Sequence, residues 1–177
     1  MNKNNLYVVT GVSGAGKTTA LRELSKRGFQ IFPEMASIVD KEERRINPDW
    51  KYIDNYLKFI ESIVKKHREL EQKSYGAPVF LDRGLIDCLV YCHYDRQPVS
   101  QNLLQACEET RYLRTFLLKP PEPQAKIVGG KTLQQVLTIE SLIEEFYARY
   151  GSKVHTVPAM SVNDRVDFIL RIIKKII

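Results

Sequence analysis

The chain has 177 residues, of which 44% are hydrophobic and 27% charged, and its formal net charge is +6. It is long enough for one domain with a sizeable core over 1–177, and it shows neither repeats nor low-complexity segments. No stretch approaches the roughly 20 apolar residues of a transmembrane helix. The three cysteines (Cys88, Cys92 and Cys107) lack metal-ligand spacing, and their odd number, with no secretory apolar segment, predicts a cytoplasmic location.

Strand and helix patterns alternate along the chain. Short apolar runs typical of buried strands occupy 6–9, 29–32, 78–81, 113–118 and 154–157. Apolar residues at helical spacing lie between them, over about 18–24, 35–45, 52–73, 84–93, 101–111, 132–149 and from 162 onward. This alternation predicts a three-layer α/β fold, a mainly parallel five-stranded sheet with helices on both faces.

The first strand leads into a glycine-rich segment, Gly11-Val12-Ser13-Gly14-Ala15-Gly16-Lys17-Thr18, which fits the phosphate-binding P-loop pattern G-x-x-x-x-G-K-[ST]. The glycines let the backbone curl so that N–H groups face phosphate oxygens, at the positive end of the following helix. Lys17 is expected to act in catalysis by reaching the β- and γ-phosphates, and the Thr18 hydroxyl to ligate Mg²⁺. We expect a nucleoside triphosphate to contact Gly11, Ser13, Gly14, Ala15, Gly16, Lys17, Thr18 and Thr19.

Ligands bind at the carboxyl ends of strands in such sheets, and charged residues follow two of the predicted strands. Asp82 ends the third strand, where a carboxylate holds Mg²⁺ through water or accepts a proton; the alternative is a cap for the helix near Gly84. Arg83 suits a phosphate or a ligand carboxylate, or else a surface salt bridge. Glu34 follows the second strand, where it would bind the acceptor or act as its base; a first-turn helix preference also explains it.

Residues 119–131 contain three prolines and the pair Gly129-Gly130, so they predict a loop. With Lys119, Lys126 and Lys131, this loop is a candidate lid that would exclude water and bring cations to the transferring phosphoryl group. The alternative is a plain surface loop with solvated lysines.

Several aromatic residues flank the acceptor side, and stacking on a heterocycle competes with a core role for each of them. Trp50 and Tyr56 are the two expected to bind substrate, from the set Trp50, Tyr52, Tyr56, Tyr91 and Tyr94. The histidines show no ligand spacing and are expected to be structural: His67, His93 and His155.

These segments together resemble the small AAA-type P-loop ATPase or kinase-like family that includes the ribosylnicotinamide kinase domain of NadR. The resemblance rests on the P-loop and six further segments: Arg27-Gly28-Phe29, Pro33-Glu34-Met35-Ala36, Phe80-Leu81-Asp82-Arg83-Gly84-Leu85-Ile86-Asp87, Pro120-Pro121, Val157-Pro158 and Asp164-Arg165-Val166. It implies a fold like that of the nucleoside and nucleotide kinases, with ATP and Mg²⁺ as ligands.

The resemblance also implies roles for individual residues. Lys17 and Thr18 would hold phosphate and metal, and Asp82 would be the carboxylate of an Asp-Arg-Gly motif. Arg83 would touch phosphate or acceptor, and Glu34 would face the acceptor. The chain after Val157 and Pro158 would border adenine. Members of the family usually carry arginine in the lid, where this chain has lysines; Lys131 is the one expected to bind the nucleotide.

The leading functional prediction is a small-molecule kinase that moves the γ-phosphoryl group of ATP to a nucleoside-like or other hydroxyl acceptor, with Asp82 or Glu34 accepting the proton. The alternative is a binding or regulatory module that depends on ATP or GTP and has weak or no kinase activity. The basic excess suits nucleotide phosphates, whereas a nucleic acid partner would need a basic stripe interleaved with aromatics, which the sequence lacks.

Overall fold

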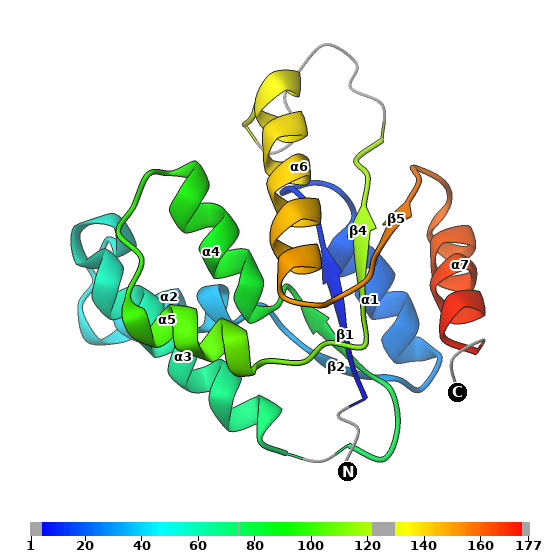
Figure 1. Cartoon of the computed structure of the whole chain (residues 1–177), viewed down its shortest axis with the longest axis horizontal. Coiled ribbons are helices and arrows are strands. Elements are labelled where there is room, and N and C mark those ends of the chain that lie inside the picture. The colour runs from blue at the N-terminus through cyan, green and yellow to red at the C-terminus, as the bar shows by residue number, and fades with distance from the viewer. Residues whose placement is uncertain (1–4, 74, 122–129, 175–177) are drawn as a thin grey trace.

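The structure, a computed structural model, describes residues 5–73, 75–121 and 130–174. At its centre is one parallel five-stranded sheet with the strand order β2-β3-β1-β4-β5 (Figure 1). The strands are β1 (Leu6–Thr10), β2 (Gln30–Phe32), β3 (Val79–Asp82), β4 (Arg114–Leu118) and β5 (Val154–Val157). The predicted sheet and its strand runs are therefore confirmed.

Helices cover both faces of this sheet (Figure 1). On one face α1 (Lys17–Lys26) packs against α7 (Val162–Lys174), and on the other α4 (Leu85–Tyr94) packs against α6 (Leu133–Arg149). Three further helices are α2 (Met35–Ile46), α3 (Tyr56–Glu71) and α5 (Gln101–Glu109). Both α3 and α5 contact α4, and α2 packs against α3. Because helices bury it from both sides, the apolar run of β1 is fully buried, as the sequence pattern predicts for a central parallel strand.

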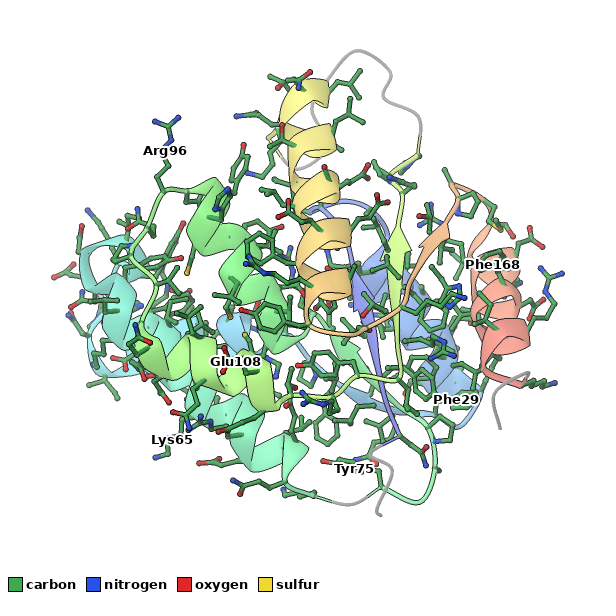
Figure 2. The ribbon with its side chains drawn as sticks, viewed as in Figure 1. Phe29, Lys65, Tyr75, Arg96, Glu108 and Phe168 are labelled. Carbon is green, nitrogen blue, oxygen red and sulfur yellow. The ribbon has the colours of Figure 1, made fainter. Side chains whose placement is uncertain are left out.

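Side chains fill the space between the sheet and the helices, whereas charged residues such as Lys65 and Arg96 point outward (Figure 2). No helix in the described part of the chain is long and apolar enough to span a bilayer.

The helical segment predicted over 52–73 is divided. A short 3-10 turn, η1 (Tyr52–Asn55), precedes α3, and the backbone of Asn55 lies outside the helical region at φ −128°. The helix predicted from 84 begins at Leu85, because Gly84 is extended and forms its N-cap. The other predicted helices keep their places to within a few residues.

The strand register brings the carboxyl ends of the strands to one edge of the sheet. Val9 pairs with Asp82 and Thr10 with Leu117. The chain leaves this edge into the P-loop after β1, into Glu34 after β2, into Arg83 after β3, and into Lys119 and Pro158 after β4 and β5. Residues far apart in the sequence therefore converge where a parallel sheet binds its ligands.

Candidate functional site

The P-loop joins β1 to α1 in a tight curl. Its glycines adopt left-handed backbone angles, with φ 134° at Gly11 and 88° at Gly16. A Cβ atom at Gly11 would lie 2.6 Å from the Leu118 carbonyl oxygen, so only glycine fits this position. Ser13, Gly14, Thr18 and Thr19 are exposed. The loop therefore presents its backbone and hydroxyl groups to the open side of the α1 N-terminus.

Lys17 lies inside this curl, with a side chain only 8% exposed. Its Nζ donates hydrogen bonds to the carbonyl oxygens of Gly11 and Val12, both at 3.0 Å. Burial lowers the pKa of Lys17 to about 8, and the neighbouring Arg83 acts in the same direction. The ammonium group is thus removed from water and bonded only to neutral carbonyl oxygens. A phosphate anion beside it would favour the protonated form and raise its pKa.

Asp82 stands at the end of β3, beside the strand that leads into the P-loop. Its Oδ1 is buried and has no hydrogen-bond partner among the described residues. Burial raises the pKa of Asp82 to about 6, Glu34 adds to that rise, and Lys17 and Arg83 oppose it. An orphaned carboxylate oxygen beside a phosphate loop fits the outer coordination of a hydrated cation.

Asp82 does not cap α4. The N-cap residue is Gly84, whose N–H donates to Oδ2 of Asp87 at 2.9 Å. Asp87 is 3% exposed and also accepts from the Thr10 hydroxyl at 2.5 Å. The capping role, left open by the sequence, therefore belongs to Asp87, and the Asp82 carboxylate is not used in it.

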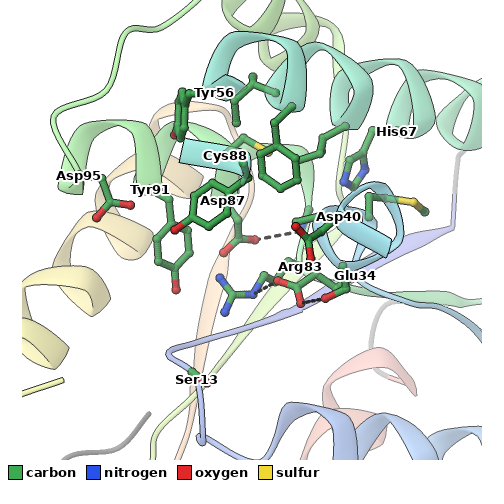
Figure 3. A pocket seen from close by; sticks show the side chains of 18 of the residues that line it. Ser13, Glu34, Asp40, Tyr56, His67, Arg83, Asp87, Cys88, Tyr91 and Asp95 are labelled. Carbon is green, nitrogen blue, oxygen red and sulfur yellow. Dashed lines mark hydrogen bonds and ion pairs between the residues drawn. The ribbon is translucent and has the colours of Figure 1, made fainter. Parts of the chain in front are cut away.

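Arg83 and Glu34 form an ion pair, with Nε 2.9 Å from Oε1 (Figure 3). The other oxygen of Glu34 accepts from the Ser37 hydroxyl at 2.7 Å. The guanidinium group of Arg83 stacks on Tyr91, 4.7 Å from the ring centre. Arg83 is not a surface salt bridge: its side chain is 16% exposed, and it lies with Glu34 in the wall of a cavity.

This cavity has a volume of about 470 Å³ and opens between α2, α3 and α4 (Figure 3). Because the sequence predicts a phosphoryl acceptor beside Glu34, we call it the acceptor cavity. Polar and charged residues of its lining include Ser13, Glu34, Arg83, Tyr91 and Lys131. Helix α3 contributes Tyr56, Phe59, Ile60 and Ile63, which we call the apolar wall. Ser13 belongs to the P-loop, so the loop and the acceptor cavity are in direct contact. The hydroxyl of Tyr56 donates to the Cys92 sulfur at 3.1 Å.

Trp50 does not reach this cavity, contrary to the expectation that it binds substrate. It is 3% exposed and lies under Lys58, whose ammonium group is 5.1 Å from the indole centre. The backbone N–H of Trp50 donates to the Asn47 carbonyl at 3.0 Å. Trp50 is therefore a core residue in the corner between α2 and α3.

A second cavity of about 700 Å³ lies at the ends of β4 and β5. Its lining includes Lys119, Pro120, Pro121, Pro158 and Arg165. Arg165 donates through Nη1 to the Ala15 carbonyl of the P-loop and through Nη2 to the Lys119 carbonyl at 2.9 Å. Pro158 therefore borders a cavity next to the P-loop, where the resemblance places adenine, whereas Val157 is fully buried.

The two ends of the candidate lid are described, and its middle is not. Lys126 and Gly129 lie outside the described residues. Lys119 binds Oε2 of the buried Glu140 at 2.7 Å. Lys131, expected to bind the nucleotide, instead lines the acceptor cavity, with its ammonium group 5.1 Å from the Tyr94 ring centre.

Sequence reasoning gave no role to several residues that the structure brings to the site. Asp87 follows Gly84 by three positions, which is the spacing of a capping box, and this signal could have identified it. Arg165 is a cation on the buried face of α7, a weaker signal. Tyr112 and Tyr147, which contact the Arg83 turn, have no local signal because they lie on distant segments.

Solved structures with this arrangement include kinases of nucleosides and nucleotides. A deoxyadenosine kinase from M. mycoides superposes with a TM-score of 0.63 and 19% identity, over 96% of this chain and 99% of that one. Thymidylate kinases from Ehrlichia chaffeensis (TM-score 0.64, 14% identity, 95% and 97% of the chains) and Candida albicans (0.65, 14%, 98% and 92%) are similarly related. At such identities the similarity establishes the fold.

No curated protein matches the sequence. The family described as AAA domain does match it, over residues 6–165. This match runs from the first strand, through the P-loop and both cavities, into the last helix. The chain therefore belongs to the AAA domain family.

Proposed function

We propose that the chain is a Mg²⁺-dependent small-molecule kinase that transfers the γ-phosphoryl group of ATP to a hydroxyl group of a nucleoside-like acceptor. The observation that carries the proposal is the direct contact between the P-loop and the acceptor cavity through Ser13. A phosphate chain bound in the loop would end where the cavity begins, with Glu34 and Arg83 in its wall. Such an arrangement positions two substrates for in-line transfer.

The residues around the P-loop fit a nucleotide with Mg²⁺. Lys17 would exchange its two carbonyl partners for phosphate oxygens, which lowers the cost of its buried charge. Thr18 would ligate the metal, and the orphaned Oδ1 of Asp82 would hold one of its water ligands. Mg²⁺ in this position would neutralise charge on the β- and γ-phosphates.

Glu34 is proposed as the base for the acceptor hydroxyl, with Asp82 as the alternative. Its carboxylate is held on both oxygens, by Arg83 and Ser37, and it lines the acceptor cavity. Arg83 would bind the acceptor beside it. The apolar wall with Tyr56 and Phe59 suits a planar heterocycle, and the structurally similar kinases named for deoxyadenosine and thymidylate support a nucleoside-like acceptor.

We assign the ATP base to the second cavity, bordered by Pro158 and Arg165. In this proposal 1–177 acts as one nucleotide-binding domain, residues 119–131 act as the lid, and the protein works in the cytoplasm. A closer relation to the ribosylnicotinamide kinase domain of NadR is part of the same proposal, and it makes ribosylnicotinamide a natural candidate acceptor.

The experiment is ADP release by the purified protein with Mg²⁺ and ATP, against nucleosides, deoxynucleosides, their monophosphates and ribosylnicotinamide. The expected result is stimulation by one acceptor class that is lost in Lys17→Ala. ATP binding without stimulation by any acceptor would contradict the kinase proposal and favour the nucleotide-dependent binding module.

A further inference from the structure

The turn between β3 and α4 is held by a buried group of side chains that no step of the proposed reaction uses. The turn consists of Arg83 and Gly84, between the end of the strand and the first residue of the helix. Arg83 has φ 66°, in the left-handed region that a side chain other than glycine seldom adopts. Strain of this kind persists only where surrounding contacts impose it, and it is concentrated at functional sites.

Two tyrosines supply those contacts, and we call Tyr112 and Tyr147 the tyrosine clamp. The Tyr147 hydroxyl accepts the N–H of Gly84 at 3.2 Å, and the Tyr112 hydroxyl accepts the N–H of Leu85 at 2.8 Å. The N–H of Gly84, which also donates to Asp87 at 2.9 Å, and the N–H of Leu85, the first residue of α4, are therefore both held by side chains from distant parts of the chain.

Each hydroxyl of the clamp also donates to a carboxylate. Tyr147 donates to Oδ2 of Asp87 at 2.5 Å, and Tyr112 donates to Oε1 of Glu71 at 2.6 Å. The tyrosine rings are 0% and 6% exposed, and burial raises the pKa of both hydroxyls well above the usual value. The hydroxyls thus keep their protons and their orientation across the physiological pH range.

The clamp also closes the space around the turn. A Cβ atom at Gly84 would lie 2.8 Å from the Tyr147 hydroxyl and 2.8 Å from the Tyr112 ring. The ring centres of the two tyrosines are 6.2 Å apart. The backbone at Gly84, directly after Arg83, is therefore confined by hydrogen bonds and by close packing.

We propose that the tyrosine clamp is a positioning device for Arg83: by fixing the N–H groups of Gly84 and Leu85, it keeps the Arg83 side chain in the wall of the acceptor cavity beside Glu34. The expected effect of the clamp on kinetics rests on the proposed function. Its expected effect on the conformation of Arg83 does not. Among the described residues the clamp hydroxyls bond Gly84, Leu85, Glu71 and Asp87, none of which belongs to the P-loop, so ATP binding is not expected to depend on the clamp.

The kinetic test is a mutant cycle with Tyr147→Phe, Tyr112→Phe/Tyr147→Phe and Arg83→Ala. The double tyrosine variant is expected to lower kcat/KM for the acceptor by at least about tenfold, mainly through KM, with the KM for ATP unchanged. In the Arg83→Ala background the same change is expected to have no further effect, because the group that the clamp positions is gone. Tyr147→Phe gives the same test, with a smaller loss, if the double variant does not fold.

The control is the matched change Tyr75→Phe, which removes a partly buried hydroxyl that donates to the Leu70 carbonyl at 3.0 Å and to no group of the Arg83 turn. It is expected to reduce stability without changing acceptor kinetics. An equal loss of kcat/KM with and without Arg83, or the same loss in the control, would overturn the proposal.

A crystal structure of the double variant, or of Tyr147→Phe, separates this inference from the proposed function. The clamp proposal predicts that Arg83 leaves the left-handed region and that its ion pair with Glu34 opens, whether or not the protein is a kinase. An unchanged Arg83 turn would overturn the clamp even if acceptor phosphorylation were established. Absence of turnover in the wild type, with a displaced Arg83 in the variant, would overturn only the kinase proposal.

Discussion

The Nε atom of Arg83 lies 2.9 Å from Oε1 of Glu34, although 49 positions separate the two residues in the sequence (83 − 34). The pair joins the end of β3 to the start of α2 across the edge of the sheet. It places a cation and a carboxylate together in the acceptor cavity, next to the P-loop residue Ser13. In the proposed reaction this pair would bind a polar acceptor and accept a proton from it.

The strain at Arg83 predicts that glycine is more stable than alanine at this position. Both substitutions remove the ion pair with Glu34 and the contact with Tyr91. Only glycine adopts φ 66° without strain, so Arg83→Gly is expected to exceed Arg83→Ala in unfolding free energy by about 1 kcal/mol. Urea unfolding of both variants measures the difference. An alanine variant as stable as the glycine variant would show that the turn is unstrained.

The Asp82 carboxylate predicts a pH-dependent stability difference. Burial raises its pKa from 3.8 to about 6, so the folded protein holds this proton more tightly than the unfolded chain does. The resulting stability is present below the unfolded value of 3.8 and is lost as the pH rises through about 6. Asp82→Asn is therefore expected to stabilise the protein by roughly 1–2 kcal/mol at pH 8, after discounting for partial exposure.

At pH 4 the same substitution is expected to change stability little, because wild-type Asp82 is then largely protonated in the folded state. Urea unfolding at both pH values, without nucleotide, provides the comparison. A destabilised Asp82→Asn at pH 8 would mean that the folded protein stabilises the carboxylate anion, contrary to the environment described above.

The position of Arg165 predicts that this residue of α7 contributes to the affinity for ATP. Its guanidinium group connects the carbonyls of Ala15 and Lys119, and lysine cannot donate to both in the same fork geometry. Arg165→Lys is expected to weaken ATP binding about tenfold, equivalent to about 1.4 kcal/mol, as measured by titration calorimetry.

The matched control is Arg27→Lys, because Arg27 at the end of α1 also bonds α7, through Asp167, but lies at the surface. Surface pairs contribute little, so this variant is expected to change ATP affinity by less than about twofold. Equal effects of the two substitutions would show that Arg165 has no particular connection with the P-loop.

The positions of Trp50 and Tyr56 predict that substituting the first changes stability and substituting the second changes the acceptor KM. Trp50→Phe is expected to lower stability by roughly 2 kcal/mol and to leave the acceptor KM unchanged, since the indole is buried away from the cavity. Tyr56→Leu changes the apolar wall of the cavity and is expected to raise the acceptor KM. A higher acceptor KM in Trp50→Phe would restore the sequence-based role of that residue.

The fold could be predicted from the sequence because its signals are local. The strand runs are short and apolar, the helical runs have helical spacing, and the P-loop sequence specifies its own geometry between β1 and α1. The residues at the strand ends, Glu34 and Arg83 among them, followed from the rule that parallel strands bind ligands at their carboxyl ends.

The rest of the site depends on contacts between distant segments. Asp87 and Tyr147 are 60 positions apart, and Arg165 and Ala15 are 150 apart, so no periodicity links them. Whether an aromatic ring faces a cavity or the core depends on how helices pack: Tyr56 lines the acceptor cavity, whereas Trp50, six positions earlier, is buried in the core. The position of Lys131 depends on packing too: it precedes α6 and its ammonium group lies over the Tyr94 ring of α4, while its role toward the nucleotide stays a prediction.

In the proposed reaction, the γ-phosphoryl group passes from ATP to an acceptor in the cavity beside Glu34 and Arg83. This transfer can be followed with ATP labelled on the γ-phosphate, in the presence of a nucleoside that binds, with Glu34→Gln in parallel. Label is expected on the acceptor, with the rate reduced by a factor of roughly 100 or more in Glu34→Gln. Label found only in inorganic phosphate, or in ATP left intact, would contradict the proposed reaction.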